Sequence, residues 1–193
     1  MTPAQFSNLA RTRRSVFPDQ FVQGKKVDDA IVREILVNAT WAPNHGRQEP
    51  WHFTVFTGEG LQKLAEFQSE LYKQVAGDQF RESNYIKLQQ RPLQASHVIA
   101  IGMMRTTKKN IPEIEDVEAV ACAVQNIYLS VAAYGLGGYW TTGGVTYYEE
   151  AKPFFGLGAD DRLLGFFYIG HVAVPSPSAS RKPIEEKVKW ITG

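Results

Sequence analysis

The sequence predicts a mixed fold of the α+β class, in which helices and strands share one hydrophobic core. The chain of 193 residues suits a single domain, 1–193, because one core typically serves roughly 100–200 residues. Amphipathic helical stretches alternate with short apolar runs typical of strands. The connections between them differ greatly in length, so an α+β arrangement is at least as well supported as a doubly wound parallel sheet. The pattern leaves open whether there are two layers or three, and in which order the strands pair.

Helices are predicted where apolar residues recur at helical spacing and capping residues precede them. Thr2 can cap the first helix and Asp28 the second, which ends before Pro43 because residues preceding proline avoid the helical region. The longest helical stretch is nearly uncharged beyond its start, so we expect it to be buried on most sides and closed by Gly135. The predicted helices span residues 3–10, 27–41, 61–77, 117–134, 148–155 and 183–190.

Strands are predicted where short runs of aromatic and β-branched residues lie between turn-forming or polar residues. These runs are residues 51–57 (WHFTVFT), 97–103 (HVIAIGM), 138–142 and 163–174 (LLGFFYIGHVAV). Residues 105–110 and 175–180 are predicted to be loops, and the polar stretch 79–94 gives no clear prediction.

Composition and motifs exclude several function classes. A net charge of +1 provides no basic excess for nucleic acid, and no apolar run approaches the ~20 residues that span a bilayer. The N-terminal residues lack the apolar centre of a signal peptide, so we expect a cytoplasmic protein. GxSxG, HExxH and CxxC motifs are absent and the four histidines are scattered, so we expect no metal site and no catalytic triad. Cys122, among alanine and valine, is predicted to be a small buried residue rather than a nucleophile.

The first of three polar segments lies at the exit of the first predicted helix. It contains Arg11, Arg13, Arg14 and Ser15. Guanidinium groups bond phosphate oxygens through paired N–H donors, and a serine hydroxyl adds a further hydrogen bond. The segment therefore predicts a phosphate-binding site, with a solvated basic surface as the alternative.

The second and third polar segments combine flat side chains with proline or glycine. Residues 42–51 (APNHGRQEPW) place amide, imidazole, guanidinium and carboxylate groups between two prolines. Residues 137–144 (GGYWTTGG) offer an indole, two hydroxyls and glycines that permit close backbone approach. Both segments suit a planar heteroaromatic ligand; the alternatives are an ordinary helix-to-strand connection and a glycine-flanked inner strand. A basic pair, Arg181 and Lys182, lies in the tail.

In their order and spacing these segments resemble the nitroreductase family of flavin mononucleotide (FMN) enzymes, most of all its small bacterial members. The matching stretches extend over nearly the whole chain: residues 13–15 (RRS), 42–51, 135–143 (GLGGYWTTG) and 181–186 (RKPIEE). The resemblance implies a three-layer α-β-α fold of the α+β class, with a central, mostly antiparallel sheet flanked by helices. It also implies a homodimer with two FMN molecules, each at the subunit interface. The apolar surplus of residues 117–134 gives dimerisation an independent physical reason.

The resemblance further implies an NAD(P)H-dependent oxidoreductase. NADH or NADPH would pass hydride to flavin N5 in a ping-pong cycle, and nitroaromatics, quinones or similar flat, electron-poor acceptors would be reduced. Because the cofactor carries the chemistry, no catalytic side chain is expected. A flavin-binding sensor or storage protein without efficient turnover is the alternative, and an interaction domain without flavin is a third possibility.

The same resemblance implies how each segment would hold FMN. Phosphate and ribityl oxygens would be bound by Arg13, Arg14 and Ser15, with help from Arg181. The ring would be lined from the other subunit by Pro43, Asn44 and His45. The ring or the ribityl chain would be reached by Trp140, Thr141, Thr142 and Gly143.

Two positions depart from the family pattern. The small relatives usually carry glutamine immediately before the second proline, where this chain has Glu49, with Gln48 one place earlier. An ionised carboxylate cannot donate a hydrogen bond, so either Gln48 takes over the contact to the flavin or Glu49 faces elsewhere. In addition, the family often has a further arginine shortly after the serine, whereas here residues 16–18 (VFP) follow.

Overall fold

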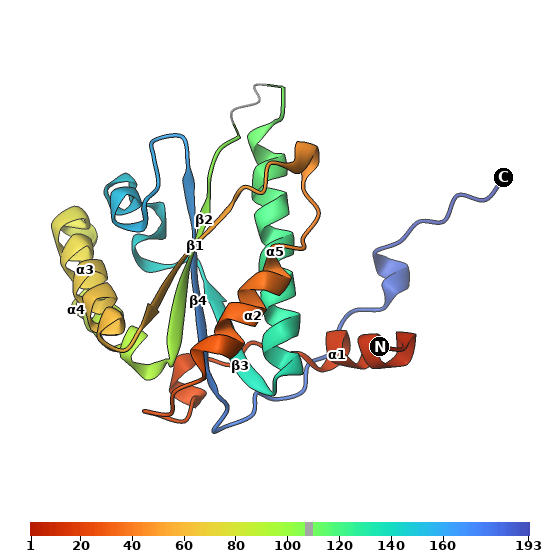
Figure 1. Cartoon of the computed structure of the whole chain (residues 1–193), viewed down its shortest axis with the longest axis horizontal. Helices are drawn as coiled ribbons and strands as arrows, with labels where there is room; N and C mark the ends of the chain where they lie inside the picture. The colour runs from red at the N-terminus through yellow and green to blue at the C-terminus, as the bar shows by residue number, and fades with distance from the viewer. Residues whose placement is uncertain (107–109) are drawn as a thin grey trace.

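A four-stranded antiparallel sheet forms the centre of the described part of the chain (Figure 1). The computed structural model describes residues 1–106 and 110–193. The strands are β1 (Trp51–Thr57), β2 (His97–Met103), β3 (Leu136–Thr141) and β4 (Arg162–His171). They pair in the order β1-β2-β4-β3, and each pairing is antiparallel. The α+β class is thereby confirmed, and the doubly wound alternative is wrong.

Helices cover both faces of the sheet, so the fold has three layers (Figure 1). α3 (Glu59–Val75) and α4 (Glu82–Gln90) lie on one face, and α2 (Asp29–Ala39) and α5 (Glu113–Ala133) lie on the other. Each face has its own hydrophobic core, with Leu64 and Phe166 in the first and Ile35 and Ile127 in the second. α1 (Pro3–Thr12) lies beside the C-terminal end of α5 (Figure 1).

The predicted capping residues are confirmed, although the helices span Pro3–Thr12 and Asp29–Ala39 rather than 3–10 and 27–41. The Thr2 hydroxyl accepts a hydrogen bond from the Gln5 N–H at 3.3 Å, and the Asp28 carboxylate accepts one from the Ala30 N–H at 2.8 Å. Gly135 follows α5 with φ +68°, the left-handed conformation that glycine adopts without strain. The polar stretch 79–94 contains α4.

α5 is buried along one side only, which corrects the prediction of a helix buried on most sides. Val124 and Ile127 face the core, whereas Ala121, Cys122 and Gln125 are exposed on the other side. Cys122 is therefore not buried, because the helical turn carries it away from the sheet. The helix also begins at Glu113, four residues earlier than the apolar pattern indicated.

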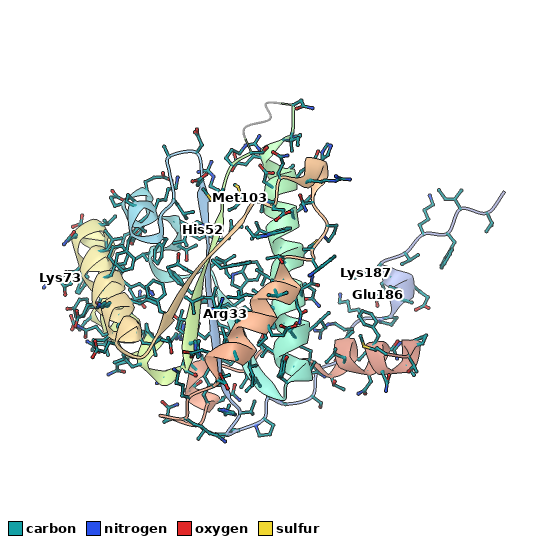
Figure 2. The ribbon with its side chains drawn as sticks, viewed as in Figure 1. Arg33, His52, Lys73, Met103, Glu186 and Lys187 are labelled. Carbon is teal, nitrogen blue, oxygen red and sulfur yellow. The ribbon has the colours of Figure 1, made fainter. Side chains whose placement is uncertain are left out.

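The C-terminal tail corrects a second prediction. Instead of a helix over 183–190, only a short 3-10 turn forms at Ile184–Glu186, and every residue from 177 onward is exposed. Figure 2 shows Glu186 and Lys187 in open surroundings, away from the sheet. A helix this short is marginal without a surface to pack on.

Four smaller points complete the fold. β4 ends at His171, earlier than predicted, and residues 149–155 form a 3-10 helix containing Pro153 rather than an α-helix. The loop predicted at 105–110 falls partly on 107–109, outside the described residues. Within the described ranges, no helix is long and apolar enough to cross a membrane.

Candidate functional site

The first polar segment follows α1 directly and contains a buried donor that has no acceptor among the described residues. Arg14 uses one terminal nitrogen to donate to the carbonyl oxygens of Arg11 and Arg13, at 2.7 and 2.9 Å. Its Nε is buried and has no hydrogen-bond partner in the described part of the chain. An unsatisfied buried donor costs about 1–3 kcal/mol, so this nitrogen is suited to an acceptor from outside the chain.

Tyr128 of α5 joins the first polar segment to the third. Its ring lies 4.7 Å beneath the Arg13 guanidinium, and its hydroxyl is 3.3 Å from Ser15 Oγ. The same hydroxyl accepts a hydrogen bond from the Trp140 backbone N–H at 2.8 Å. The Trp140 indole N–H donates to the Leu164 carbonyl at 3.0 Å, so Trp140 offers a ligand its ring but no free donor.

The third polar segment turns sharply after β3. The Thr141 hydroxyl accepts from the Gly143 N–H at 3.3 Å, and the Thr146 hydroxyl donates to the Gly143 carbonyl at 2.8 Å. Gly165 of β4, at φ +111°, lies against the Thr141 carbonyl, where any side chain would clash. Thr142 and Gly143 are exposed at the tip of this turn.

A run of three hollows, each sharing lining residues with the next, lies between the first and third polar segments. The first hollow, about 530 Å³, is lined by Arg14, Ser15 and Phe17 together with tail residues 176–179. The second, about 220 Å³, shares Phe17 with the first and extends to Lys87 and Arg91 of α4 and its C-cap.

The run continues from α4 to the turn after β3. Lys87 and Arg91 also line a hollow of about 60 Å³ with Gln68 and residues 141–144. The floor of this hollow includes Tyr168, whose pKa is raised by burial so that its hydroxyl stays protonated. The run thus ends at Thr141 and Gly143, and polar side chains line it at both ends: Arg14 and Ser15 at one, Gln68 and Thr141 at the other.

The residues of this run that were not foreseen from the sequence include Gln68, Lys87 and Arg91. Gln68 is buried in α3, and its Nε2 is a second donor without a partner among the described residues. Lys87 and Arg91 are four residues apart, a spacing at which like charges on a helix repel each other. That spacing is the sequence feature that could have indicated an anion site, since a negative group between the two side chains stabilises such a pair.

The second polar segment lies elsewhere in the chain. Its 3-10 turn, η2 (His45–Arg47), stands beside the N-terminal end of α5, whereas α1 lies beside the C-terminal end (Figure 1). Glu115 and Tyr128, which contact the second and first segments respectively, are separated by ~20 Å along the helix at 1.5 Å per residue. The segment leads into β1, at the opposite sheet edge from β3, and lines none of the hollows described above.

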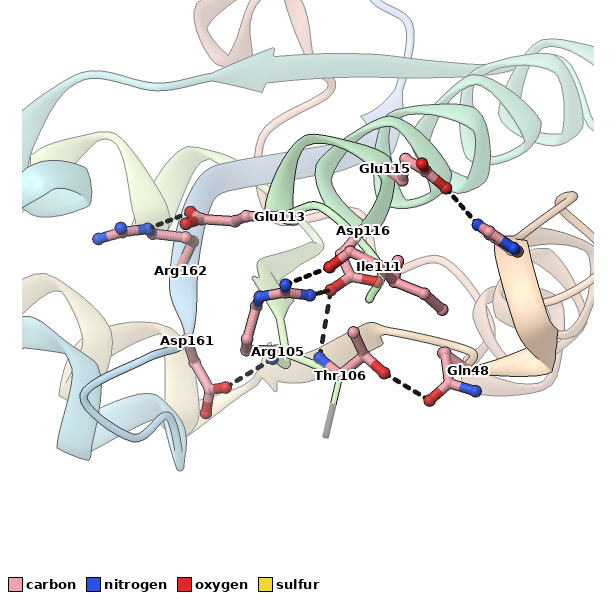
Figure 3. Close-up of polar contacts among 10 residues, drawn as sticks. Gln48, Arg105, Thr106, Ile111, Glu113, Glu115, Asp116, Asp161 and Arg162 are labelled. Atoms are coloured by element: carbon pink, nitrogen blue, oxygen red, sulfur yellow. Dashed lines mark hydrogen bonds and ion pairs between the residues drawn. The ribbon is translucent and has the colours of Figure 1, made fainter. Parts of the chain in front are cut away.

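Hydrogen bonds within the chain hold the second polar segment. The Gln48 amide donates to the Gly46 carbonyl at 2.7 Å. It also accepts from the Thr106 hydroxyl at 2.5 Å (Figure 3). Asn44 Oδ1 accepts from the Glu49 N–H at 3.0 Å. The amide of Gln48 is therefore occupied, and the exposed Glu49 side chain has no partner among the described residues. Pro43 is exposed at the start of the segment.

The backbone of this segment is strained. Arg47 and Glu49 have φ values of +55° and +49°, in the left-handed region that residues with a side chain rarely adopt. Strain of this kind costs of order 1–3 kcal/mol per residue and persists where surrounding contacts impose it. Here those contacts come from Asn44, Thr106 and α5.

The tail crosses the first polar segment before leaving the body of the protein. The Ser176 hydroxyl donates to the Ser15 carbonyl at 2.7 Å, and Arg14 reaches the Ala179 carbonyl at 3.5 Å. Arg181 is exposed, and its only hydrogen bond among the described residues is to the carbonyl of Ser180, so its guanidinium is not part of the hollow. No group of three or more potential metal ligands occurs in the described ranges.

Comparison with known proteins decides the family. The model of the nitroreductase family matches residues 10–171. The chain belongs to the nitroreductase family. Among curated nitroreductases, YdjA of Escherichia coli K12 is 27 % identical over 139 residues, covering 72 % of this chain and 74 % of YdjA. YfhC of Bacillus subtilis is 26 % identical over 183 residues, covering 93 % of this chain and 91 % of YfhC; both are assigned by name to the NAD(P)H nitroreductases.

Solved nitroreductase structures share the fold. A nitroreductase-like protein from Bacillus cereus is 30 % identical, with a TM-score of 0.83, and the match covers 100 % of this chain and 99 % of that one. A Desulfovibrio desulfuricans protein in complex with FMN has a TM-score of 0.73 at 22 % identity, covering 100 % and 98 %. NfnB of Mycobacterium smegmatis, in complex with NADPH, has a TM-score of 0.76 at 17 % identity, covering 99 % and 100 %.

Proposed function

We propose that this chain is an FMN-dependent oxidoreductase that uses NADH or NADPH to reduce flat, electron-poor acceptors such as nitroaromatics and quinones. The observation that carries the proposal is the run of hollows from Arg14 to Gly143. Near each end of the run lies a buried donor without a partner in the described part of the chain. Family membership supports it, as do the FMN and NADPH complexes described for the D. desulfuricans and M. smegmatis proteins. We also propose a cytoplasmic location, because NAD(P)H is available there.

The residues of the run fit the two chemically different ends of FMN. Near the first polar segment, Arg14 Nε and the Ser15 hydroxyl can bond phosphate oxygens, and Arg13 adds positive charge. At the other end, Gln68 Nε2 and the backbone around Gly143 can bond the polar edge of the ring. Arg181 could join the phosphate only if the tail closed over it.

When bound, FMN would supply the redox chemistry of the proposed ping-pong cycle, hydride transfer through N5 between the nicotinamide and the acceptor. The chain's own contribution is positional and electrostatic. Lys87 and Arg91 place positive charge beside the turn after β3, where it stabilises negative charge developing on the ring. Trp140, with its N–H already bonded to Leu164, provides flat apolar surface, so binding of acceptors relies on stacking rather than on specific hydrogen bonds.

We also propose that the site is completed by a second copy of the chain. Within one chain the second polar segment lies far from the hollows, so its role toward FMN requires a partner. Apolar side chains that such a partner could cover are Trp41, which is 82 % exposed, Phe6 of α1 and Ile114 of α5. Burying this surface would stabilise a dimer by about 25 cal/mol per Å².

An absorption spectrum of the purified protein after incubation with FMN tests the proposal. We expect the protein to retain FMN through gel filtration, and rapid anaerobic mixing with NADH or NADPH to bleach the bound flavin. Retention of FMN without bleaching would instead favour the sensor or storage role. A colourless protein that retains no FMN would contradict the proposed function.

A further inference from the structure

We propose that Glu115 is a positioning residue of this site. Its carboxylate holds the His45 imidazole by Nδ1 and presents Nε2 of that ring to the ligand bound by a second copy. The inference rests on the proposed function, because it takes the second polar segment to face the partner's FMN.

The contact between the two side chains is direct. His45 Nδ1 lies 2.5 Å from Glu115 Oε2, and the bond joins η2 to the first turn of α5 across 70 positions of sequence (Figure 3). The His45 side chain is 58 % exposed, and no described residue bonds its Nε2. The ring is thus fixed at one nitrogen and accessible at the other.

The chemistry of the pair decides which nitrogen carries the proton. An ionised carboxylate can only accept hydrogen bonds, so the proton of the neutral imidazole resides on Nδ1. Nε2 then presents a lone pair outward. A carboxylate that bonds one imidazole nitrogen fixes both the tautomer and the orientation of the ring, as it does for histidines that bind metals.

His45 is also a planar side chain of this segment that remains available to a ligand. The amide oxygen of Asn44 and both ends of the Gln48 amide are engaged in the hydrogen bonds that hold the loop. The strained backbone at Arg47 and Glu49 restricts how the loop can rearrange. A contact that orients the His45 ring therefore decides which nitrogen of this side chain the segment presents to a ligand.

The neighbouring acids of α5 provide a matched control. Glu113 bonds Arg162 of β4 at 2.7 Å, and Asp116 bonds Arg105 after β2 (Figure 3). These two pairs fasten the helix start to strand ends, whereas Glu115 alone among the three binds the second polar segment. Glu113→Gln thus weakens an ion pair on the same helical turn without touching His45.

The test uses the full-length protein and two readouts. The first is the tautomer of His45, measured by ¹⁵N NMR of the flavin-free chain. We expect Nδ1–H in the wild type and in Glu115→Gln, whose amide oxygen still accepts that proton, and a shift toward Nε2–H in Glu115→Ala.

The second readout is the affinity for FMN, measured by fluorescence titration. Glu115→Ala should bind FMN roughly 5- to 30-fold more weakly, as for the loss of one oriented hydrogen bond, whereas Glu115→Gln and Glu113→Gln should change the affinity less than about 3-fold. In a His45→Ala background, Glu115→Ala should cause no further loss, because it acts through His45.

Three results would overturn the inference: an unchanged tautomer in Glu115→Ala, an equal loss of affinity in Glu113→Gln, or additive losses in the double variant. If the tautomer shifts and FMN still binds normally, the pair orients the ring without acting on the ligand, and the inference is overturned as well. If the wild-type protein binds no FMN at all, the proposed function itself fails.

Discussion

The two parts of the proposed site differ in how far their polar groups are satisfied. Along the run of hollows, Arg14 Nε and Gln68 Nε2 are buried without partners among the described residues. In the second polar segment, Asn44, His45 and Gln48 all bond other groups of the same chain. The difference indicates that the first part needs a ligand to complete it, whereas the second is preorganised before any ligand arrives.

The energetic consequences are opposite. An unpartnered buried donor destabilises the free protein by about 1–3 kcal/mol, which a ligand acceptor can recover. A strained loop that is already hydrogen-bonded pays its cost on folding, so binding requires little further ordering. Variants in the first part should therefore have one effect on the affinity for FMN and a different effect on the stability of the flavin-free protein.

The largest effect is expected from Arg14→Ala. Removing a charged donor to phosphate should weaken FMN binding roughly 10- to 100-fold, since hydrogen bonds to charged groups contribute about 1.5–3 kcal/mol. Fluorescence titration measures the loss. Arg11→Ala, which removes an exposed arginine of the same segment, should bind FMN like the wild type. Equal affinities for the two variants would show that the first hollow does not hold the phosphate.

Gln68→Leu should have opposite effects on stability and on binding. Replacing the unpartnered amide by an apolar group should stabilise the flavin-free protein by about 1 kcal/mol and weaken FMN binding several-fold. Urea unfolding and FMN titration give the two values. Gln62→Leu, at an exposed position of the same helix, is the control and should leave affinity unchanged. A destabilised variant with normal affinity would mean that Gln68 is simply part of the core.

Tyr128→Phe tests the link between the first and third polar segments. Without the hydroxyl, the Trp140 backbone N–H loses its acceptor and Ser15 loses a neighbour, which should destabilise the protein by about 1–2 kcal/mol. Urea unfolding measures the change. Tyr134→Phe, at the exposed C-cap of the same helix, should have almost no effect. Similar stabilities would show that the link is not needed.

The smallest expected effect is on the pH dependence of stability, and it concerns His97, which belongs to the fold and not to the proposed site. Burial lowers the pKa of His97 below its ordinary value, although a hydrogen bond to Asp29 opposes this. The unfolded chain therefore binds a proton near pH 6.5 that the folded chain does not, so stability should fall as the pH drops below about 6.5. Thermal unfolding between pH 7.5 and 5.5 should show this decline, and His97→Gln should reduce it. An unchanged pH dependence in that variant would assign the decline to other groups.

Local sequence patterns predicted much of the fold. β1 and β2 were predicted at their observed bounds, because each is a short apolar run bounded by residues that interrupt strands. The tail helix was predicted wrongly, since its apolar spacing is helical but no surface packs against it. Cys122 was misplaced because a uniformly small, apolar helix does not reveal which of its sides faces the sheet.

The site was predictable in its residue types but not in its arrangement. Arginine, serine and glycine positions could be named from the chemistry they suit. The contacts that organise them, such as Tyr128 with Trp140 and Glu115 with His45, depend on how α5 packs, which no local pattern encodes. The same holds for Gln68 and Arg91, which reach the third segment from separate helices across the sheet face.

The central claim is that two copies of the chain build each FMN site, and complementation between variants tests it directly. Arg14→Ala and His45→Ala chains should each form dimers in which both sites are damaged. A mixed dimer, purified with two different affinity tags, should contain one intact site and one doubly damaged site. Titration should therefore find one tightly bound FMN per two chains. If a single chain held the whole site, every site in the mixed dimer would carry one defect. Titration would then find no tightly bound FMN, and that result would contradict the account.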